Sequence, residues 1–215
     1  ITGAVFMSAF TTKTAVYVLV RAFPGTELLV WMGTIMAVYG VFYATLQDNM
    51  RRLLSYHIVS QVGYMVAGIG LGSQLALNGS VSHAFTHILY KGLLFMGTGS
   101  VMFMTGKRRL SELGGLYKYM PITMLLYLIA GFSISAFPLF SGFVSKSMII
   151  AAANHDHRAI IVLLLTLTSA GTFLSTTLKL PYFAFFGKDS GIKAKEPPVN
   201  MLIGMGIAAF LCVAI

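Results

Sequence analysis

Long apolar runs dominate this chain and restrict the folds that it can adopt. Several runs of roughly 20 residues follow one another, and each is long enough to span a bilayer as a helix. Of the 215 residues, 57% are hydrophobic and 10% are charged, whereas a soluble domain carries about 25% charged residues. Backbone groups in lipid must bond to one another, which leaves helices or a closed barrel. Because the alternating segments of a barrel are absent, the sequence predicts an all-α, polytopic transmembrane helix bundle.

About seven apolar segments can be delimited. The fifth is too long for one straight span and is interrupted by Phe-Pro-Leu-Phe-Ser-Gly-Phe (137–143), where proline removes a backbone donor. The chain begins without methionine and stops within an apolar run, so we expect a piece of a longer protein. The segments are Ile1–Val20, Leu28–Leu46, Leu53–Leu71, Leu75–Met104, Pro121–Ala153, Ala159–Phe186 and Asn200–Ile215.

Basic residues are distributed unevenly between the loops of this arrangement. Alternate loops hold two on one side, Arg21 and Arg158, and nine on the other. The positive-inside rule places the richer set in the cytoplasm. This flanking of spans explains the net charge of +9 without nucleic-acid binding. The nine are Arg51, Arg52, Lys107, Arg108, Arg109, Lys118, Lys188, Lys193 and Lys195.

Four further lysines fall inside the apolar segments, and none of the six acidic residues does. A lysine at the bilayer centre costs about 2.5–3.5 kcal/mol on insertion scales. Such groups usually face the bundle interior or a water-filled cavity and mark an ion pathway. The four are Lys13, Lys91, Lys146 and Lys179.

The stretch His83-Ala-Phe-Thr-His-Ile-Leu-Tyr-Lys-Gly92 places three titratable groups within one long apolar segment. Residues four apart are neighbours on a helix, so His83, His87 and Lys91 form one stripe. Histidine exchanges a proton near neutral pH, and a buried lysine can do the same. The stripe predicts part of a proton wire. The alternative is that the histidines donate to neighbouring helices and that the lysine sits at a helix junction.

Three other lysines and one histidine are further candidates. Lys146 follows the interrupted stretch, and broken helices at membrane depth commonly build transport sites, so we predict that it accepts protons. Lys13 lies near the end of the first segment, and Lys179 lies near the cytoplasmic end of its own. For each lysine the alternative is a side chain that extends to the membrane surface. His57 is either a proton entry point or a packing residue.

The remaining reactive residues do not predict a cofactor or metal site. His155 and His157 favour an exposed polar loop over a metal site, and the single Cys212 favours packing and excludes a disulfide framework. Facing histidines for haem, paired cysteines and a glycine-rich phosphate motif are lacking. We therefore expect no cofactor, and an ion transporter subunit rather than an enzyme.

Three stretches together resemble a known family. Gln-Asp-Asn-Met-Arg-Arg-Leu-Leu-Ser-Tyr-His-Ile-Val-Ser-Gln-Val-Gly-Tyr (47–64), His83–Gly97 and Phe137–Lys146 are similar to the antiporter-like subunits. These are large membrane subunits of respiratory complex I, membrane-bound hydrogenases and Mrp-type cation/proton antiporters. The resemblance covers nearly the whole chain. Tyr-His (56–57) and Phe-Thr-Thr-Lys-Thr-Ala-Val-Tyr (10–17) most resemble the D-type subunit of the Mrp antiporters.

The resemblance implies the second five-helix inverted repeat of that fold, with one broken helix. Residues 1–27 would link from a first repeat, 28–186 would form the second repeat with the proton path, and 187–215 would form a cytoplasmic loop and a final helix. The first repeat, with its ion-paired glutamate and lysine, would lie upstream.

The resemblance also implies roles for individual residues. Lys13 would connect two half-channels. His83, His87 and Lys91 would continue a hydrated axis, and Lys146 would face the non-cytoplasmic side.

These expectations describe a proton-translocating subunit of a multisubunit Mrp-type Na⁺/H⁺ antiporter in a bacterial cytoplasmic (inner) membrane. Its partners would be other membrane subunits, protons, Na⁺ and the lipid bilayer. One alternative is a proton-pumping subunit of complex I or of a membrane hydrogenase. Others are a subunit for proton-coupled inorganic carbon uptake, and a scaffold in which the lysines only bridge helices.

Overall fold

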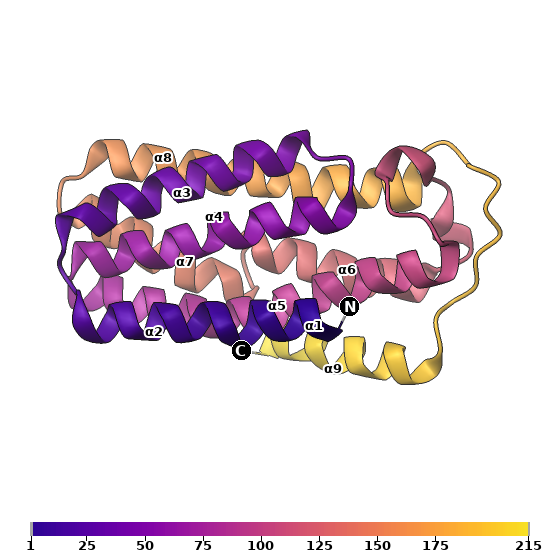
Figure 1. Cartoon of the computed structure of the whole chain (residues 1–215), viewed down its shortest axis with the longest axis horizontal. Helices are drawn as coiled ribbons and strands as arrows, with labels where there is room; N and C mark the ends of the chain where they lie inside the picture. The colour runs from indigo at the N-terminus through magenta and orange to yellow at the C-terminus, as the bar shows by residue number, and fades with distance from the viewer. Residues whose placement is uncertain (1, 215) are drawn as a thin grey trace.

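The computed structural model describes residues 2–214 as a bundle of helices that run roughly along one axis (Figure 1). No strand is present within that range, which confirms the predicted all-α fold. The elements in chain order are α1 (Thr2–Phe6), η1 (Met7–Thr11), α2 (Thr12–Ala22), α3 (Glu27–Leu46), α4 (Met50–Leu71), α5 (Gln74–Thr105), η2 (Leu110–Glu112), η3 (Leu116–Lys118), α6 (Pro121–Ile134), α7 (Ser141–His155), α8 (Ala159–Thr172), η4 (Phe173–Lys179), η5 (Tyr182–Phe186) and α9 (Val199–Ala214).

Three continuous helical stretches are each long and apolar enough to cross a membrane by length and composition. They are α3, α5 and the stretch Ala159–Phe186, which comprises α8, η4 and η5. The shorter α6 and α9 are also apolar. Large apolar side chains such as those of Phe42, Leu163 and Phe210 are exposed on the outside of the bundle. A surface of this kind suits contact with lipid tails rather than with water.

Capping residues explain where α4 begins and where α4 and α5 end. The Asn49 side chain accepts the backbone N–H groups of Arg51 and Arg52 at 3.0 and 3.3 Å, so α4 begins at Met50, three residues before the predicted start. Gly72 and Gly106 follow the last residues of α4 and α5 with φ of 72° and 71°. That left-handed conformation is typical of a glycine that ends a helix.

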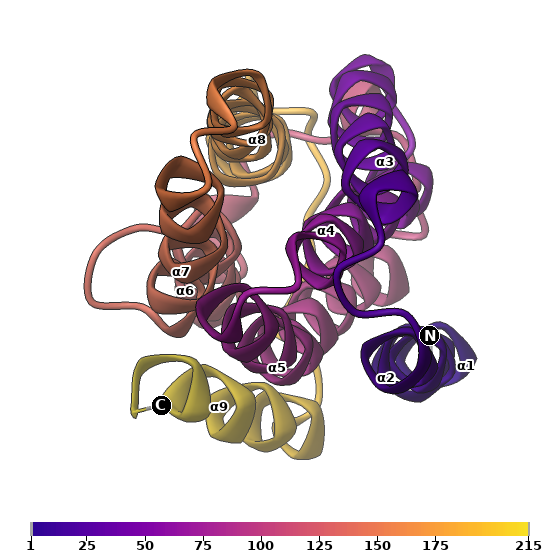
Figure 2. The same cartoon turned by 90° about the vertical axis from the view of Figure 1, so that its left-hand side faces the viewer.

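The helices α3 and α4 pack with their backbones in close contact (Figure 2). A Cβ atom added to Gly63 would lie 2.5 Å from the backbone nitrogen of Ala37. One added to Gly40 would lie 2.5 Å from the nitrogen of Ser60. Small residues permit such an approach between membrane helices, where dispersion contacts replace the hydrophobic effect as the packing force.

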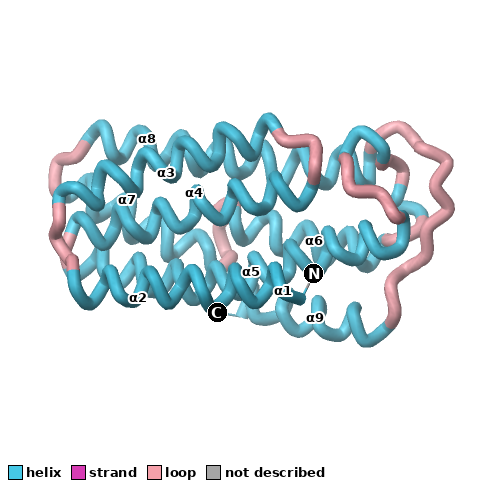
Figure 3. The backbone as a smooth tube through the Cα atoms, in the orientation of Figure 1, coloured by secondary structure: helices cyan, strands magenta, loops and turns pink. Residues whose placement is uncertain are grey.

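The predicted break in the fifth segment is present, but its limits differ from the prediction. Residues 135–140 are irregular and join α6 to α7 as a loop partway along the length of the bundle (Figure 3), with Phe137 and Leu139 exposed. Ala136 and Leu139 have φ of 58° and 76°, a strained conformation for residues with a side chain. Phe140 is extended, and a Cβ on Gly142 would collide with the Ser133 carbonyl. The helix α7 begins at Ser141. Residues 141–143, which were expected in the break, are therefore helical.

Three basic loops meet at one end of the bundle, at the right of Figure 1. The Met50 backbone N–H donates to the Arg108 carbonyl at 3.1 Å, and the Leu110 N–H donates to the Asp48 carbonyl at 2.9 Å. Glu196, in the segment before α9, accepts from the Thr123 hydroxyl at 2.6 Å. The structure thus brings together the loops that hold the nine basic residues. Which side of a membrane they face stays a prediction.

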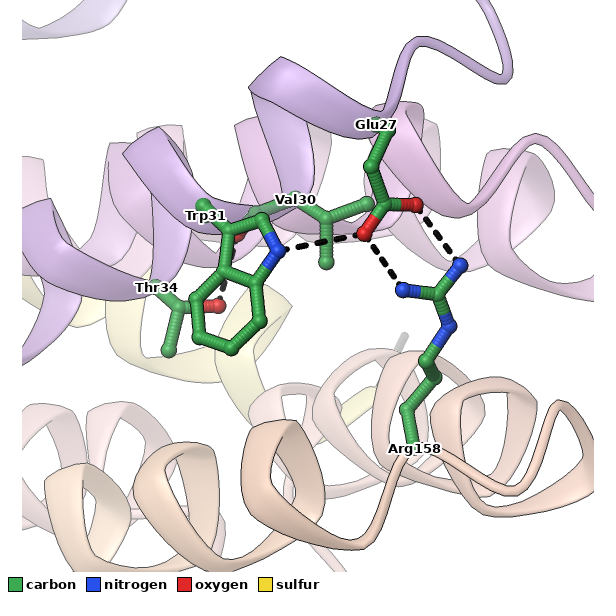
Figure 4. A network of polar contacts seen from close by, with 5 residues as sticks. All are labelled: Glu27, Val30, Trp31, Thr34 and Arg158. Atoms are coloured by element: carbon green, nitrogen blue, oxygen red, sulfur yellow. Dashed lines mark hydrogen bonds and ion pairs between the residues drawn. The ribbon is translucent and has the colours of Figure 1, made fainter.

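The opposite end carries an exposed ion pair between the starts of α3 and α8 (Figure 4). The two terminal nitrogens of Arg158 donate to the two carboxylate oxygens of Glu27 at 2.5 and 2.6 Å. The Trp31 indole N–H also donates to Glu27, at 3.1 Å. Hydrogen bonds with Glu27 raise the pKa of Arg158. The pair joins α3 to α8 outside the apolar interior.

Candidate functional site

The predicted titratable residues are buried inside the bundle. His57, His83, His87 and Lys91 are 0% exposed, and Lys146 is 1% exposed. Within residues 2–214, the ion pairs are His155–Asp156 and Arg158–Glu27. The buried lysines therefore have no carboxylate partner in the described part of the chain. A buried charge without a partner is costly, so these amines sit where stability alone would not favour them.

His83 joins three helices. Its Nδ1 lies 2.9 Å from the Ser145 hydroxyl of α7, and its Nε2 lies 3.2 Å from Gln61 Oε1 of α4. Gln61 donates through its nitrogen to the Thr172 hydroxyl at 3.5 Å, so its oxygen faces His83. An amide oxygen only accepts, and His83 Nε2 therefore carries the ring proton. Nδ1 faces the hydroxyl of Ser145, the residue before Lys146, and that hydroxyl also lies 3.3 Å from the Gly142 carbonyl oxygen.

His87 contacts Lys13, which was predicted to lie on the same path. The Lys13 ammonium lies 2.6 Å from His87 Nδ1 and also donates to the Ser8 carbonyl at 2.7 Å and the Thr12 hydroxyl at 3.2 Å. These three acceptors match the three donors of an ammonium group. Lys13 therefore points into the bundle rather than to the membrane surface. The His83 and His87 rings are 6.3 Å apart between centroids.

Lys91 is fully buried, and its Nζ has no hydrogen-bond partner among the described residues. It lies 5.6 Å from the centre of the Phe95 ring. Phe95 also lines a pocket of about 310 Å³ with Ser8, Thr12 and Ser55. The buried Ser8 hydroxyl likewise lacks a partner in this part of the chain. The lining of this pocket is mainly apolar, with Met7 and Ile58 among its residues, and Lys91 is not one of them.

Lys146 lies at the break between α6 and α7. Its Nζ donates to the Ile134 carbonyl, in the last residue of α6, at 2.7 Å. The same Nζ lies 5.0 Å from the centre of the Tyr64 ring, and the Tyr64 hydroxyl donates to the Leu165 carbonyl. The alternative of a side chain extended to the surface does not describe Lys146.

Lys179 and His57 lie apart from the stripe. Lys179 Nζ donates to the carbonyls of Thr45 and Gln47 at 2.6 and 2.8 Å, and thereby satisfies carbonyls at the end of α3. His57 Nε2 lies 2.8 Å from both the Ser175 and the Thr176 hydroxyls. The structure therefore does not bring Lys179 together with the other candidates, and it places His57 against η4.

Several residues that complete these contacts were not singled out from the sequence. Gln61 lies four residues after His57 on α4, so helical spacing could have suggested it, whereas Ser145 directly precedes Lys146 and carries no such signal. Ser175 and Thr176 carry no such signal. Across residues 2–214, no group of three His, Cys, Asp or Glu side chains could hold a metal ion. The arrangement places several nitrogen and oxygen atoms that can exchange protons within hydrogen-bond distance of one another.

The chain is similar in sequence to known membrane proteins. Residues 1–174 match the family described as NADH:quinone oxidoreductase/Mrp antiporter, TM. The D subunit of the Na(+)/H(+) antiporter of Alkalihalophilus pseudofirmus is 34% identical over 211 residues, which cover 94% of this chain and 42% of that protein.

Two solved structures are similar along nearly the whole chain. The membrane-bound sulfane sulfur reductase, an archaeal respiratory membrane complex, matches with a TM-score of 0.89 and 29% identity over 97% of this chain and 38% of the other. The Mrp complex from Dietzia sp. matches with a TM-score of 0.88 and 22% identity over 98% and 49%. The chain spans less than half the length of each of these three proteins.

Proposed function

Because this chain belongs to the NADH:quinone oxidoreductase/Mrp antiporter transmembrane family, we propose that it is a proton-translocating subunit of an Mrp-type Na⁺/H⁺ antiporter. The observation that supports this most directly is the burial of Lys91 and Lys146 without a carboxylate partner in the described residues. The similarity to the D subunit of an Na(+)/H(+) antiporter favours this assignment. Its partners would be other membrane subunits, protons and Na⁺, and its location a bacterial cytoplasmic membrane.

In this proposal, protons move along the buried line and leave near Lys146, or run in reverse. The contact between Lys13 and His87 at 2.6 Å, and the contact between His83 and Ser145, the residue before Lys146, at 2.9 Å, support this path. Protonation of one amine makes protonation of the next harder, because like charges disfavour each other. A charge that arrives at Lys13 would therefore favour proton release further along.

The division of labour along the chain is part of the same proposal. Residues 1–27 would link to a preceding repeat, 28–186 would hold the proton path, and 187–215 would form a cytoplasmic loop and a final helix. Movement of one charge against 100 mV costs about 2.3 kcal/mol. A cation gradient must supply that energy in an antiporter.

A second candidate is a subunit of a redox-driven complex, in which electron transfer elsewhere supplies the energy. The similarity to the archaeal respiratory complex, at a TM-score of 0.89, supports this second candidate function. Both candidates use the same residues of this chain for proton transfer. They differ in the other subunits of the complex, which supply the energy. Identification of the subunits that co-purify with this chain would separate them.

The test is transport driven by a pH gradient in vesicles that contain the whole complex. Lys91→Ala and Lys146→Ala should each reduce transport by about a hundredfold, the scale of a lost proton-transfer group. Membrane insertion should be unchanged. Lys193→Ala, in the exposed loop before α9, is the matched control and should transport normally.

Two outcomes would contradict the proposal. Undiminished transport in both alanine variants would exclude these lysines from the path. Full transport by Lys91→Met would favour a scaffold, because methionine fills similar space without titrating.

A further inference from the structure

Three consecutive hydroxyl residues on the π-helical segment η4 are buried. Ser175 and Thr176 are 0% exposed, and Thr177 is 4% exposed. Successive residues on an α-helix point about 100° apart, so three neighbours rarely share one buried face. The wider π-helical turn is rare and often occurs at functional sites. It turns Ser175 and Thr176 toward α4, and Thr177 toward the broken end of α6.

Thr177 anchors η4 to the break. Its hydroxyl donates to the Gly131 carbonyl at 2.6 Å. The Ser135 hydroxyl lies 2.5 Å from the same Thr177 oxygen and must donate to it, since the one Thr177 proton is already used. These contacts hold the π-helical turn beside the end of α6, where the Ile134 carbonyl accepts from Lys146.

The contacts of His57 define which of its ring nitrogens is protonated. The Ser175 hydroxyl donates its single proton to the Gly171 carbonyl at 2.6 Å. At 2.8 Å from His57 Nε2 it can then only accept, so Nε2 carries hydrogen in the neutral ring. The other nitrogen, Nδ1, is buried and has no partner among the described residues. Nδ1 is therefore the atom of His57 that is free to take up a proton.

Gln61 lies one helical turn from this histidine and contacts the central stripe. Gln61 lies one turn after His57 on α4, so the two share a face. It contacts Thr172, which precedes η4, at 3.5 Å and His83 at 3.2 Å. A polar line thus runs along the seam between α4 and η4 and reaches His83. Lys91 and His87 do not lie on it.

We propose that α4 and η4 form a second branch of the proton path, which runs from His57 to His83. The branch rests on the proposed function. His57 forms an N–H bond at Nδ1 with a proton that a hydronium ion gives up, and the proton already on Nε2 passes to the Thr176 oxygen as the Nε2–H bond breaks. The Thr176 hydroxyl proton moves to a water molecule, and water would carry it past Gln61 to the unprotonated ring nitrogen of His83. Ser175 and Gln61 are positioning residues that hold the two histidine rings.

The test uses the whole complex in vesicles, with the transport rate recorded against pH. Thr176→Val removes the hydroxyl at nearly constant volume, and together with Ser175→Ala it should lower the rate about tenfold, the scale of a lost hydrogen bond to a charged group. It should also change the pH profile. Thr176→Ser should restore both. Thr166→Val is the matched control, because Thr166 is exposed on α8 and bonds only to the Val162 carbonyl.

The outcomes separate the branch from the function on which it rests. A wild-type rate and pH profile in the double variant, with transport still lost in Lys91→Ala, would overturn the branch alone. Transport that survives in Lys91→Ala and Lys146→Ala would overturn the function. If the double variant does not assemble, Gln61→Leu tests the same branch from α4. An unchanged pH profile in that variant would equally reject it.

Discussion

Charged residues are paired at the exposed end of this bundle, whereas the lysines in its interior have no carboxylate partner among the described residues. At the start of α3, Arg158 and Glu27 pair through two hydrogen bonds, and their side chains are 39% and 54% exposed. In the interior, Lys91 and Lys146 are buried without a carboxylate neighbour in residues 2–214. An exposed pair contributes little to stability, whereas an unpaired buried amine destabilises the fold. The buried amines are therefore retained at a cost in stability, which a function must explain.

Lys146→Arg should produce the largest effect, because it separates charge from titration. Arginine stays charged at every accessible pH, so it can keep a contact with the Ile134 carbonyl but cannot release a proton. Transport should fall by about a hundredfold, measured in vesicles with the whole complex. Lys193→Arg is the control in the exposed loop. Normal transport by Lys146→Arg would mean that only the charge matters at this position, and the contrast between the two regions would lose its basis.

Gly63→Ala should damage the scaffold without touching the site. The added Cβ would lie 2.5 Å from the Ala37 nitrogen, and overpacking of this kind costs about 1–3 kcal/mol. Thermal unfolding in detergent should shift downward, while transport per folded complex stays constant. Gly204→Ala is the matched control, since nothing lies within 4 Å of its added Cβ. Loss of transport at normal stability would show that the α3–α4 contact takes part in the mechanism.

Glu27→Gln should have the smallest effect. It removes the charge that pairs with Arg158 at an exposed position, where ion pairs contribute little. Transport should remain within about a factor of two of the wild type, and the effect should shrink further at high salt because exposed charges are screened. A collapse of transport in Glu27→Gln would place the exposed pair in the path and erase the distinction between the two regions.

The fold class could be predicted because each apolar run, from its length and its lack of acidic residues, indicates a membrane helix without information from the rest of the chain. The stripe on α5 was also visible, since His83, His87 and Lys91 repeat at the spacing of one helical face. Their burial agrees with the pattern, and their roles stay predictions. The break in the fifth segment was predicted from Pro138. Its start at Ser135, directly after the end of α6 at Ile134, was not predicted, because no residue type marks it.

The contacts between helices could not be predicted from one sequence. Gln61 and Ser145 reach His83 from α4 and α7, and only the packing of three helices sets those distances. The π-helical segments η1, η4 and η5 also escaped prediction, since each adds one residue to a turn without a distinctive residue type. Lys179 shows that a charged residue within an apolar segment need not lie with the other candidates. Its amine bonds to carbonyls at the end of α3.

The contact between Lys146 and the last residue of α6 has a further consequence. Carbonyls at the C-terminus of a helix lack intrahelical donors and together carry the equivalent of about half a negative charge. A carboxylate in that place could itself take up a proton, whereas a peptide dipole cannot be protonated at any physiological pH. The negative pole of α6 is therefore permanent, and in the proposed function Lys146 would cycle between its ammonium and amine forms against a counter-charge that never changes.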